Sequence, residues 1–313
     1  MRPFSKKILI TGATGFIGSN LVRKLISKNH QIHIIMRKAS DIWRIKDIIS
    51  KINVHNVNLL EKEKLSNILN IIKPNVIFHL ANLGLYAGSD PKIEDSIKIN
   101  TLGTINLIQS SHLIDYECFI NTGSSSEYGT KQFPMKETDI CTPYSNYAIA
   151  KLAGTLYTNL YAKKTKKPIA TFRIFSPYGP YDHPDRLISQ AILKMIKGEQ
   201  FFSNEPYAVR DYIFIEDVVD AYLLCMRRYK KISGEIFNIG SGTQSYVKDV
   251  IKLLAGELET NLVRWNTSKK NDTVWQADIE KAKKQLGWYP KKTLEEGLRE
   301  TVAWFKNNFH IYD

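Results

Sequence analysis

One tyrosine in this chain is spaced for acid–base chemistry. Among 16 tyrosines only Tyr147 has a lysine four residues later, Lys151. On a helix, residues i and i+4 share a face, so the ammonium would lie beside the phenol. A neighbouring cation lowers the pKa of a phenol from its usual value of about 10. Tyr147 is therefore a candidate proton donor and acceptor near neutral pH.

Three hydroxyl side chains, Ser124, Ser125 and Ser126, lie upstream of this pair, directly after an apolar run that predicts a buried strand at Cys118–Thr122. Open α/β sheets bind ligands at the carboxyl ends of their parallel strands. A serine there can hydrogen bond a substrate hydroxyl or carbonyl and hold it against Tyr147. An ordinary serine-rich turn is the alternative interpretation.

A glycine-rich turn follows the first apolar run, with glycines at Gly12, Gly15 and Gly18. The first lets the chain turn sharply, the second lets backbone N–H groups approach a pyrophosphate, and the third lets the next helix lie close to the sheet. The turn therefore predicts a dinucleotide site. Phe16 and Ile17, within the turn, are expected to bind the cofactor as well.

The residues after the second apolar run bear on the choice of cofactor. An acidic residue about 20 positions beyond the glycines usually binds the ribose 2′-hydroxyl of NAD. Here Arg37 and Ser40 stand in that region, and no acid occurs before Asp41. An arginine and a serine can hold a 2′-phosphate, which favours NADP over NAD. A solvated basic loop is the alternative, and NAD remains open.

The elements that would position these residues alternate along the first 175 residues. Apolar, β-rich runs are separated by helical patterns, which predicts an α/β fold with a doubly wound parallel sheet of the Rossmann kind. We expect a dinucleotide-binding domain over 1–175, to which 208–240 return. A smaller C-terminal lobe, formed by 176–207 and 241–313, is expected to bind the substrate. The predicted strands are Lys7–Ile10, Ile32–Met36, Val54–Asn58, Val76–Leu80, Cys118–Thr122, Ile169–Phe175, Tyr212–Ile215 and Glu235–Ile239, and the predicted helices include Asn20–Ser27, Leu65–Ile72, Leu187–Lys197 and Val218–Arg228.

Together these motifs resemble the extended short-chain dehydrogenases/reductases of the NAD-dependent epimerase/dehydratase family. The resemblance extends over nearly the whole chain. It includes the glycine turn, the serine run before Tyr128-Gly129, and the Tyr147/Lys151 pair. Further matching segments are His79-Leu80-Ala81, Asn100-x-x-Gly103-Thr104, Arg173-x-x-Ser176-Pro177-Tyr178-Gly179-Pro180, Arg210-Asp211-Tyr212-Ile213, Asn238-Ile239-Gly240 and Leu286-Gly287-Trp288-x-Pro290.

The resemblance implies a role for each matching residue. Ser124, Tyr147 and Lys151 would be catalytic, with Lys151 also contacting the nicotinamide ribose beside Tyr147. Leu80 and Ala81 would lie along the cofactor. The substrate, a nucleotide-diphosphate sugar, would contact Ser125, Ser126, Ser176, Arg186 and Arg210, with the arginines on its diphosphate. A homodimer is the expected assembly.

Departures from the family pattern narrow the expected reaction. Family 4,6-dehydratases carry an Asp-Glu pair after the catalytic residue, where this chain has Ser125 and Ser126. Ser176 replaces a frequent Asn. The chain is most similar to sugar-nucleotide 4-ketoreductases of the CDP-abequose synthase kind, so we expect NADPH-dependent reduction at C4. A C4 epimerase or dehydrogenase that retains NAD is the alternative, and a redox-silent binding protein is a remote one.

Composition is consistent with a globular enzyme. The chain has 313 residues, 43% hydrophobic and 24% charged, with a formal net charge of +13. Its lysines are scattered and accompany no nucleic-acid-binding motif, so no nucleic-acid partner is expected. Three distant cysteines indicate a reducing compartment, and no metal-ligand cluster is visible. The basic N-terminus lacks a signal-peptide core and no run reaches membrane-spanning length, so we expect a cytoplasmic protein that binds no membrane.

Overall fold

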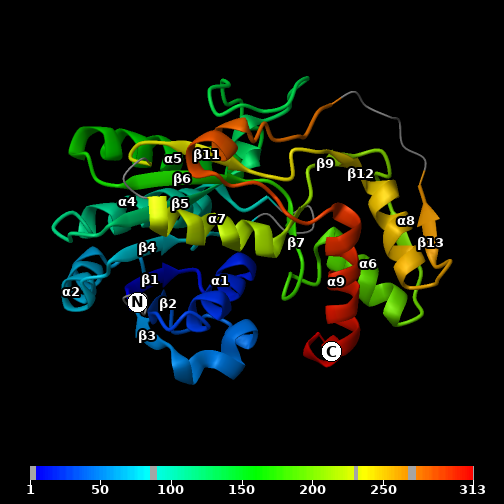
Figure 1. Cartoon of the computed structure of the whole chain (residues 1–313), viewed down its shortest axis with the longest axis horizontal. Coiled ribbons are helices and arrows are strands. Elements are labelled where there is room, and N and C mark those ends of the chain that lie inside the picture. The colour runs from blue at the N-terminus through cyan, green and yellow to red at the C-terminus, as the bar shows by residue number, and fades with distance from the viewer. Residues whose placement is uncertain (1–4, 85–89, 229–231, 267–272, 313) are drawn as a thin grey trace.

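The structure is a computed structural model that describes residues 5–84, 90–228, 232–266 and 273–312. A parallel seven-stranded sheet forms its centre, in the order β11-β6-β5-β4-β1-β2-β3 (Figure 1). The order reverses beside β1, as in doubly wound sheets. The predicted Rossmann-like α/β fold is therefore confirmed. The strands are β1 (Lys7–Thr11), β2 (Gln31–Met36), β3 (Asn53–Asn56), β4 (Val76–His79), β5 (Cys118–Ser124), β6 (Ile169–Ile174) and β11 (Ile236–Ile239).

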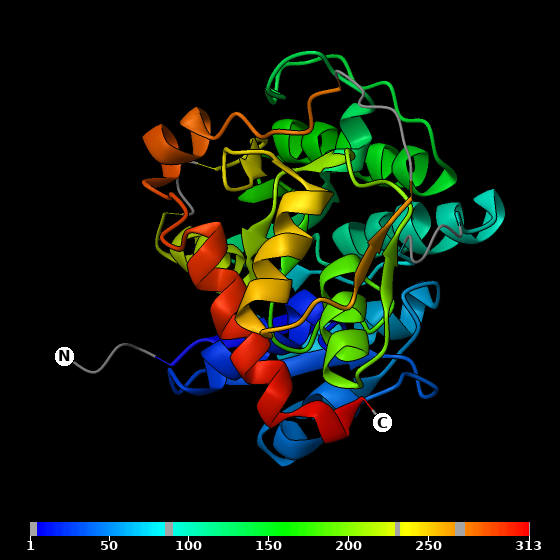
Figure 2. The same cartoon turned by 90° about the vertical axis from the view of Figure 1, so that its right-hand side faces the viewer.

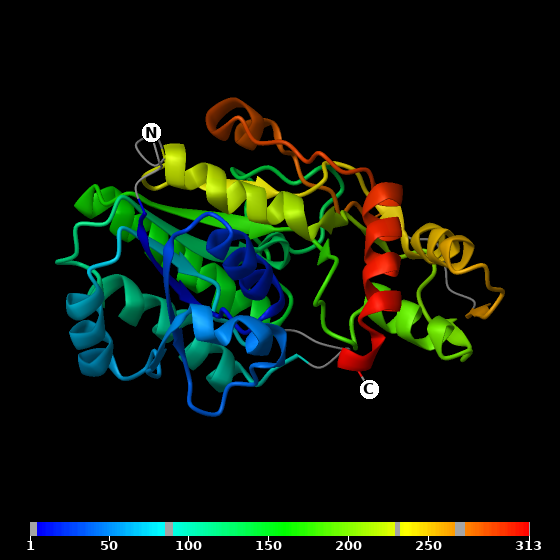
Figure 3. The same ribbon diagram turned by 60° about the horizontal axis from the view of Figure 1, so that its bottom comes forward.

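Helices cover both faces of the sheet, which explains why its central strands β4, β5 and β6 are buried along their whole length. The helices α1 (Phe16–Ile26) and α7 (Ile215–Arg228) pack together over one face. On the other face lie α2 (Lys62–Ile72), α4 (Gly103–Ser110) and α5 (Asn146–Thr165). Alternate strand residues serve the two cores: Ile8 and Ile10 face α1, whereas Leu9 faces the α2 side. Figure 3 shows the sheet between these layers.

Three helices form a smaller lobe beyond the carboxyl ends of the strands. They are α6 (Leu187–Ile196), α8 (Val247–Glu257) and α9 (Leu294–Asn307), which contact one another and lie side by side in Figure 2. Short strands complete the connections: β7 (Pro177–Tyr178), β8 (Phe201–Ser203), β9 (Val209–Arg210), β10 (Ile213–Phe214), β12 (Ser245–Tyr246) and β13 (Val263–Trp265). The assignment of cofactor and substrate to the two lobes stays a prediction.

Some elements differ from the sequence prediction. The first helix begins at Phe16, inside the glycine turn, rather than at Asn20. A 3-10 helix, η1 (Trp43–Lys51), follows β2, and a chain of α3 (Ile93–Ser96), η2 (Ile97–Leu102) and α4 precedes β5. The predicted strand Tyr212–Ile215 is shortened to β10, because α7 already begins at Ile215.

No helix within the described ranges is long and apolar enough to cross a membrane. Residues 1–4, which form much of the basic N-terminus considered above, lie outside the described residues.

Candidate active site

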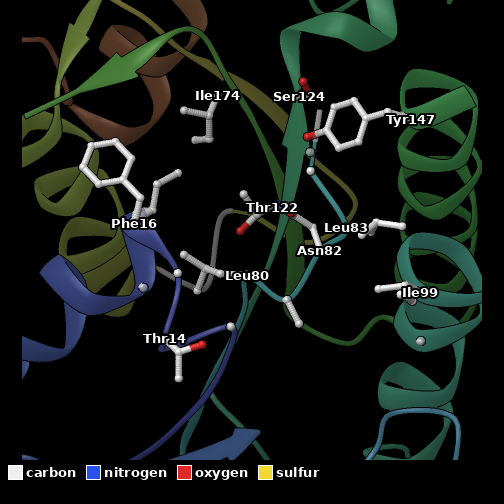
Figure 4. A pocket seen from close by; sticks show the side chains of 18 of the residues that line it. Thr14, Phe16, Leu80, Asn82, Leu83, Ile99, Thr122, Ser124, Tyr147 and Ile174 are labelled. Carbon is white, nitrogen blue, oxygen red and sulfur yellow. The ribbon is translucent and has the colours of Figure 1, made fainter. Parts of the chain in front are cut away.

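A cleft of about 700 Å³ opens at the carboxyl ends of β1, β2, β4 and β5, a size typical of small-molecule sites. It contains every site residue predicted from the sequence except Lys151. Figure 4 shows Thr14 and Phe16 on the side of the glycine turn, facing Ser124 and Tyr147 across the cleft. The predicted residues that line it are Gly12, Gly15, Phe16, Ile17, Gly18, Arg37, Ser40, Leu80, Ala81, Ser124, Ser125, Ser126, Tyr147, Ser176, Arg186 and Arg210.

Two positions in the glycine turn require glycine. Gly12 has φ = 72°, and a Cβ there would lie 2.4 Å from the backbone nitrogen of Ala81. A Cβ on Gly18 would lie 2.1 Å from the carbonyl oxygen of Gly12. The turn therefore packs against the end of β4 and against the start of its own helix. This leaves the amino end of α1 open toward the cleft, an arrangement that suits a pyrophosphate.

The end of β2 carries the basic turn that was predicted to select the cofactor. The backbone N–H of Arg37 donates to the Ser40 hydroxyl at 3.1 Å, and the Ser40 N–H donates to the Arg37 carbonyl at 2.9 Å. The Arg37 side chain is exposed and lines the cleft, with no partner among the residues that the structure describes. This turn holds both side chains at the end of β2, where they line the cleft.

Ser124 lies at the last position of β5 and starts a short 3-10 helix, η3 (Ser125–Tyr128). Its side-chain oxygen accepts a hydrogen bond from the backbone N–H of Ser126 at 3.1 Å. Because a hydroxyl has one proton to donate, Ser124 can still donate to a substrate oxygen. Ser125 is buried beside it and Ser126 is half-buried.

Hydrogen bonds at the amino end of α5 fix the position of Tyr147. The Ser145 hydroxyl caps the helix by accepting the Ala148 N–H at 3.1 Å. The Asp90 carboxylate accepts the backbone N–H groups of Asn146 at 2.7 Å and Tyr147 at 3.1 Å. The half-buried phenol then points from α5 into the cleft, toward Ser124 (Figure 4). Asp90 was not predicted to contribute, since it is distant from Tyr147 in sequence.

Lys151 is the predicted site residue that does not line the cleft. Its side chain is 5% exposed, and its ammonium donates to the backbone carbonyl of Thr122 on β5. Burial lowers the pKa of Lys151 to about 8, and the Glu127 charge opposes that shift. The ammonium thus lies below the floor of the cleft, and its contact with a cofactor ribose stays a prediction.

A buried ion pair lies behind the serine turn. The Arg173 Nε donates to Glu127 Oε2 at 2.8 Å, with the two side chains 3% and 0% exposed. From the sequence, Arg173 is only part of a motif and Glu127 has no expected role. The sequence carried one signal of this pair. Arg173 lies within an apolar run that predicts a buried strand, and charged side chains are rarely fully buried unless they are paired.

His79 joins three elements below the cofactor side of the cleft. Its Nδ1 lies 2.7 Å from Thr11 Oγ1, and its Nε2 lies 2.8 Å from Thr104 Oγ1. Thr104 donates to the Asn100 carbonyl, so it accepts from His79 Nε2–H. Burial lowers the pKa of His79 to about 3, which favours the neutral ring with its proton on Nε2. The ring therefore fixes β1, β4 and α4 relative to one another, a structural role.

Two arginines define the end of the cleft nearest the lobe. Arg186 pairs with the buried Asp182 at 3.1 Å, and its guanidinium carbon lies 5.6 Å from the Phe16 ring centre. The guanidinium carbon of Arg210 lies 5.0 Å from the Trp275 ring centre. Both arginines also line an adjoining cavity of about 550 Å³. Two half-buried guanidinium groups at this junction can bind a diphosphate.

The chain is similar in sequence to known enzymes. Residues 8–240 match the NAD dependent epimerase/dehydratase family. The UDP-glucose 4-epimerase of Mycolicibacterium smegmatis is 29% identical, over 96% of this chain and 99% of its own.

Solved structures of similar sequence share the fold. A UDP-glucose 4-epimerase from Thermotoga maritima, with UDP-glucose, is 30% identical with a TM-score of 0.87, covering 97% of this chain and 99% of its own. The UDP-glucuronic acid 4-epimerase of Bacillus cereus, with UDP-glucuronic acid and NAD, is 27% identical with a TM-score of 0.85, covering 96% and 99%. All three similar proteins are enzymes.

Proposed function

Because the chain belongs to the NAD dependent epimerase/dehydratase family, we propose that it catalyses hydride transfer at C4 of a nucleotide-diphosphate sugar. One observation carries this proposal: the Tyr147 phenol faces Ser124 within a single cleft that also contains the glycine turn, Arg186 and Arg210. In this proposal the glycine turn binds the dinucleotide, the two arginines bind the diphosphate, and Tyr147 is the acid–base residue.

The residues present fit a nicotinamide dinucleotide. The glycine turn leaves backbone N–H groups for its pyrophosphate, and Leu80 and Ala81 line the path toward Tyr147. When bound, the cofactor would accept or supply the hydride. Tyr147 donates a proton to the developing alkoxide at C4, or removes that proton in the oxidising direction. Ser124 donates a hydrogen bond to the same oxygen and orients it, while the positive charge of Lys151 favours the phenolate.

Arg37 and Ser40 support NADP as the preferred cofactor, since a guanidinium and a hydroxyl can bind a 2′-phosphate. The similar Bacillus cereus enzyme is described with NAD, so NAD is the competing cofactor. For the net reaction, Ser125 and Ser126 occupy the positions of the acid pair used in dehydration. This supports a 4-keto sugar reductase.

A C4 epimerase is the second candidate, favoured by the two UDP-glucose 4-epimerases and the UDP-glucuronic acid 4-epimerase to which the chain is similar. An epimerase would oxidise C4 and then reduce the ketone from its opposite face. It would therefore retain its cofactor through purification, whereas a reductase would exchange it with added NADPH.

The test is an assay with CDP-, GDP-, dTDP- and UDP-sugars, as parent and 4-keto forms, in which nicotinamide absorbance and product sugars are followed. NADPH consumption with a 4-keto sugar supports the reductase, and interconversion of C4 epimers without net cofactor turnover supports the epimerase. A 4-keto-6-deoxy product from a parent sugar would contradict both.

Tyr147→Phe tests the assigned acid–base residue in the same assay. This change keeps the ring and removes the ionisable group, so turnover should fall by at least about 10²-fold with cofactor affinity nearly intact. Turnover equal to that of the wild type would refute the assignment.

We further propose that the enzyme is a homodimer that pairs through α5. The side of α5 opposite the sheet carries exposed apolar residues, Ile149, Leu156 and Leu160. Their spacing places them on one face of the helix.

A further inference from the structure

A fully buried carboxylate, Glu127, lies directly behind the serine turn. It contacts β5, α5 and β6 at once through hydrogen bonds to Ser124, Thr155 and Arg173. We propose that Glu127, held by Arg173, is a positioning residue that fixes Ser124 relative to the helix that carries Tyr147. This inference rests on the proposed function, in which Ser124 and Tyr147 share one substrate oxygen.

Both carboxylate oxygens of Glu127 are used. Oε1 accepts the backbone N–H of Ser124 at 2.9 Å and the Thr155 hydroxyl at 3.0 Å. Oε2 accepts the Arg173 Nε–H at 2.8 Å. All three neighbours are therefore donors, and an ionised carboxylate is the side chain that offers only acceptors. A glutamine would have to turn its NH₂ group toward one of these donors.

The bond to Ser124 fixes the orientation of the serine. It closes a capping box, in which the Ser124 hydroxyl caps η3 while Glu127 returns to the Ser124 N–H. Gly123 makes room for this contact, because a Cβ there would lie 2.6 Å from Glu127 Oε1. The conformation of the serine turn thus depends on the position of this carboxylate.

The bond to Thr155 carries the same restraint to α5. Thr155 follows Lys151 by one helical turn, on the buried side of the helix. Lys151 in turn donates to the Thr122 carbonyl on β5. Two contacts, one from Lys151 to the end of β5 and one from Thr155 to Glu127 of η3, therefore hold α5 beside the serine turn. They set the distance between Ser124 and Tyr147, which lies one turn before Lys151.

Arg173 keeps the carboxylate in place. Its guanidinium packs on the Tyr128 ring at 4.4 Å and donates to the Cys141 sulfur at 3.2 Å, while its Nη1 is buried with no partner in the described part of the chain. A buried ion pair is weak evidence for stability, because desolvation offsets the attraction. The role of this ion pair in the proposal is therefore to hold the Glu127 carboxylate against the Ser124 N–H.

The experiment measures kcat, KM and unfolding midpoint for Glu127→Gln, with the nucleotide sugar that turns over in the assay above. A misplacement of about 1 Å can reduce turnover about 100-fold. A smaller misplacement in Glu127→Gln should therefore lower kcat at least about tenfold. The Kd of the cofactor should not change. Adding Arg173→Met should restore much of kcat, because the amide oxygen introduced by Glu127→Gln no longer has to face a guanidinium and can accept the Ser124 N–H.

Thr155→Val provides a second test that removes one hydrogen bond and keeps the shape of the side chain. It should lower kcat, whereas Thr155→Ser, which keeps the hydroxyl, should not. Wild-type kcat in Glu127→Gln, or in Thr155→Val if Glu127→Gln does not fold, would overturn the inference. So would a double variant with no recovery of kcat.

Tyr147→Phe separates this inference from the proposed function. If Tyr147→Phe is inactive while Glu127→Gln and Thr155→Val are fully active, only the positioning role fails. If Tyr147→Phe is fully active, the proposed function fails and the positioning role fails with it.

Discussion

At the end of β2, the exposed Arg37 guanidinium lines the cleft beside Ser40, and neither residue is acidic. If this guanidinium binds a 2′-phosphate, Arg37→Ala should weaken NADPH binding by about 2 kcal/mol and leave NADH binding nearly unchanged. Calorimetric titration of both cofactors measures this difference. Equal effects on the two cofactors, or a wild-type preference for NADH, would contradict the role given to Arg37.

His79 predicts a dependence of stability on pH. Burial lowers the pKa of His79 to about 3 from 6.5, and the Lys151 charge adds to the shift. Below pH 6.5 the unfolded chain binds a proton that the folded chain excludes. The stabilisation is therefore complete above pH 6.5 and is lost as pH falls toward 3. Between about pH 6.5 and about pH 5 the loss from this residue is about 2 kcal/mol.

Urea denaturation at about pH 7 and about pH 5 tests this prediction through the His79→Gln variant. The variant should be less stable than the wild type at neutral pH but lose less stability on acidification. His33, whose pKa burial and the nearby His55 lower to about 4, contributes in the same direction, so the effect of His79 is the difference between the two proteins. The exposed His310→Gln variant is the control and should behave as the wild type.

At the scale of elements, the loop between β7 and α6 is held by parts of the chain distant in sequence. The Pro180 carbonyl accepts from Asn20 of α1 at 2.9 Å. The Tyr181 carbonyl accepts from Arg44 of η1 at 2.7 Å. The Tyr312 hydroxyl, near the C-terminus, donates to the Asp182 carbonyl at 2.9 Å. These contacts fix the segment that leads to Arg186.

Tyr312→Phe removes one of these contacts and keeps the ring. Loss of a single hydrogen bond should lower the unfolding free energy by about 1 kcal/mol. Because Asp182 pairs with Arg186, we also expect KM for the nucleotide sugar to rise with little change in kcat. Tyr289→Phe, at an exposed tyrosine, is the matched control. An unchanged KM would mean that Tyr312 only stabilises the lobe.

The positions of the strands and many residues of the cleft could be predicted because local patterns indicate both. Apolar runs of strand length predicted β1 through β6, and the spacing of Gly12, Gly15 and Gly18 located the turn. Contacts between distant residues were not encoded locally. Asp90 caps α5 and Glu127 meets Arg173 only after the strands have paired. The burial of Lys151 likewise depends on how α5 packs against β5.

At the scale of the whole molecule, the residues that line the cleft come from two parts of the fold. The glycine turn and Arg37 come from the sheet layer, whereas Arg186 and Arg210 come from the connections to the lobe. Tyr147, at the start of α5, lines the same cleft. If the proposed cofactor binds the residues of the first part and the proposed nucleotide sugar binds those of the second, the two ligands share one cleft with Tyr147, independently of which sugar the substrate carries.

Helix α5 carries both Tyr147, which lines the cleft, and the exposed apolar residues of the proposed dimer interface. Ile149, Leu156 and Leu160 are 43%, 59% and 51% exposed, on the side of α5 away from the sheet. Leu102 of the neighbouring η2 is 43% exposed as well, and η2 packs against α5. An apolar surface built from two adjacent helices can be self-complementary under twofold symmetry, which suits an isologous dimer.

Leu156→Glu should therefore convert a dimer into a monomer, because a carboxylate at the centre of an apolar interface would be desolvated without a partner. Light scattering coupled to size-exclusion chromatography measures the mass. Ile71→Glu, at a residue of α2 that is 75% exposed, is the control and should stay dimeric. Turnover should fall in the Leu156→Glu monomer, since the partner helix no longer braces the helix that carries Tyr147 and Lys151. A wild-type monomer, or a dimer that survives Leu156→Glu, would place the interface elsewhere or remove it.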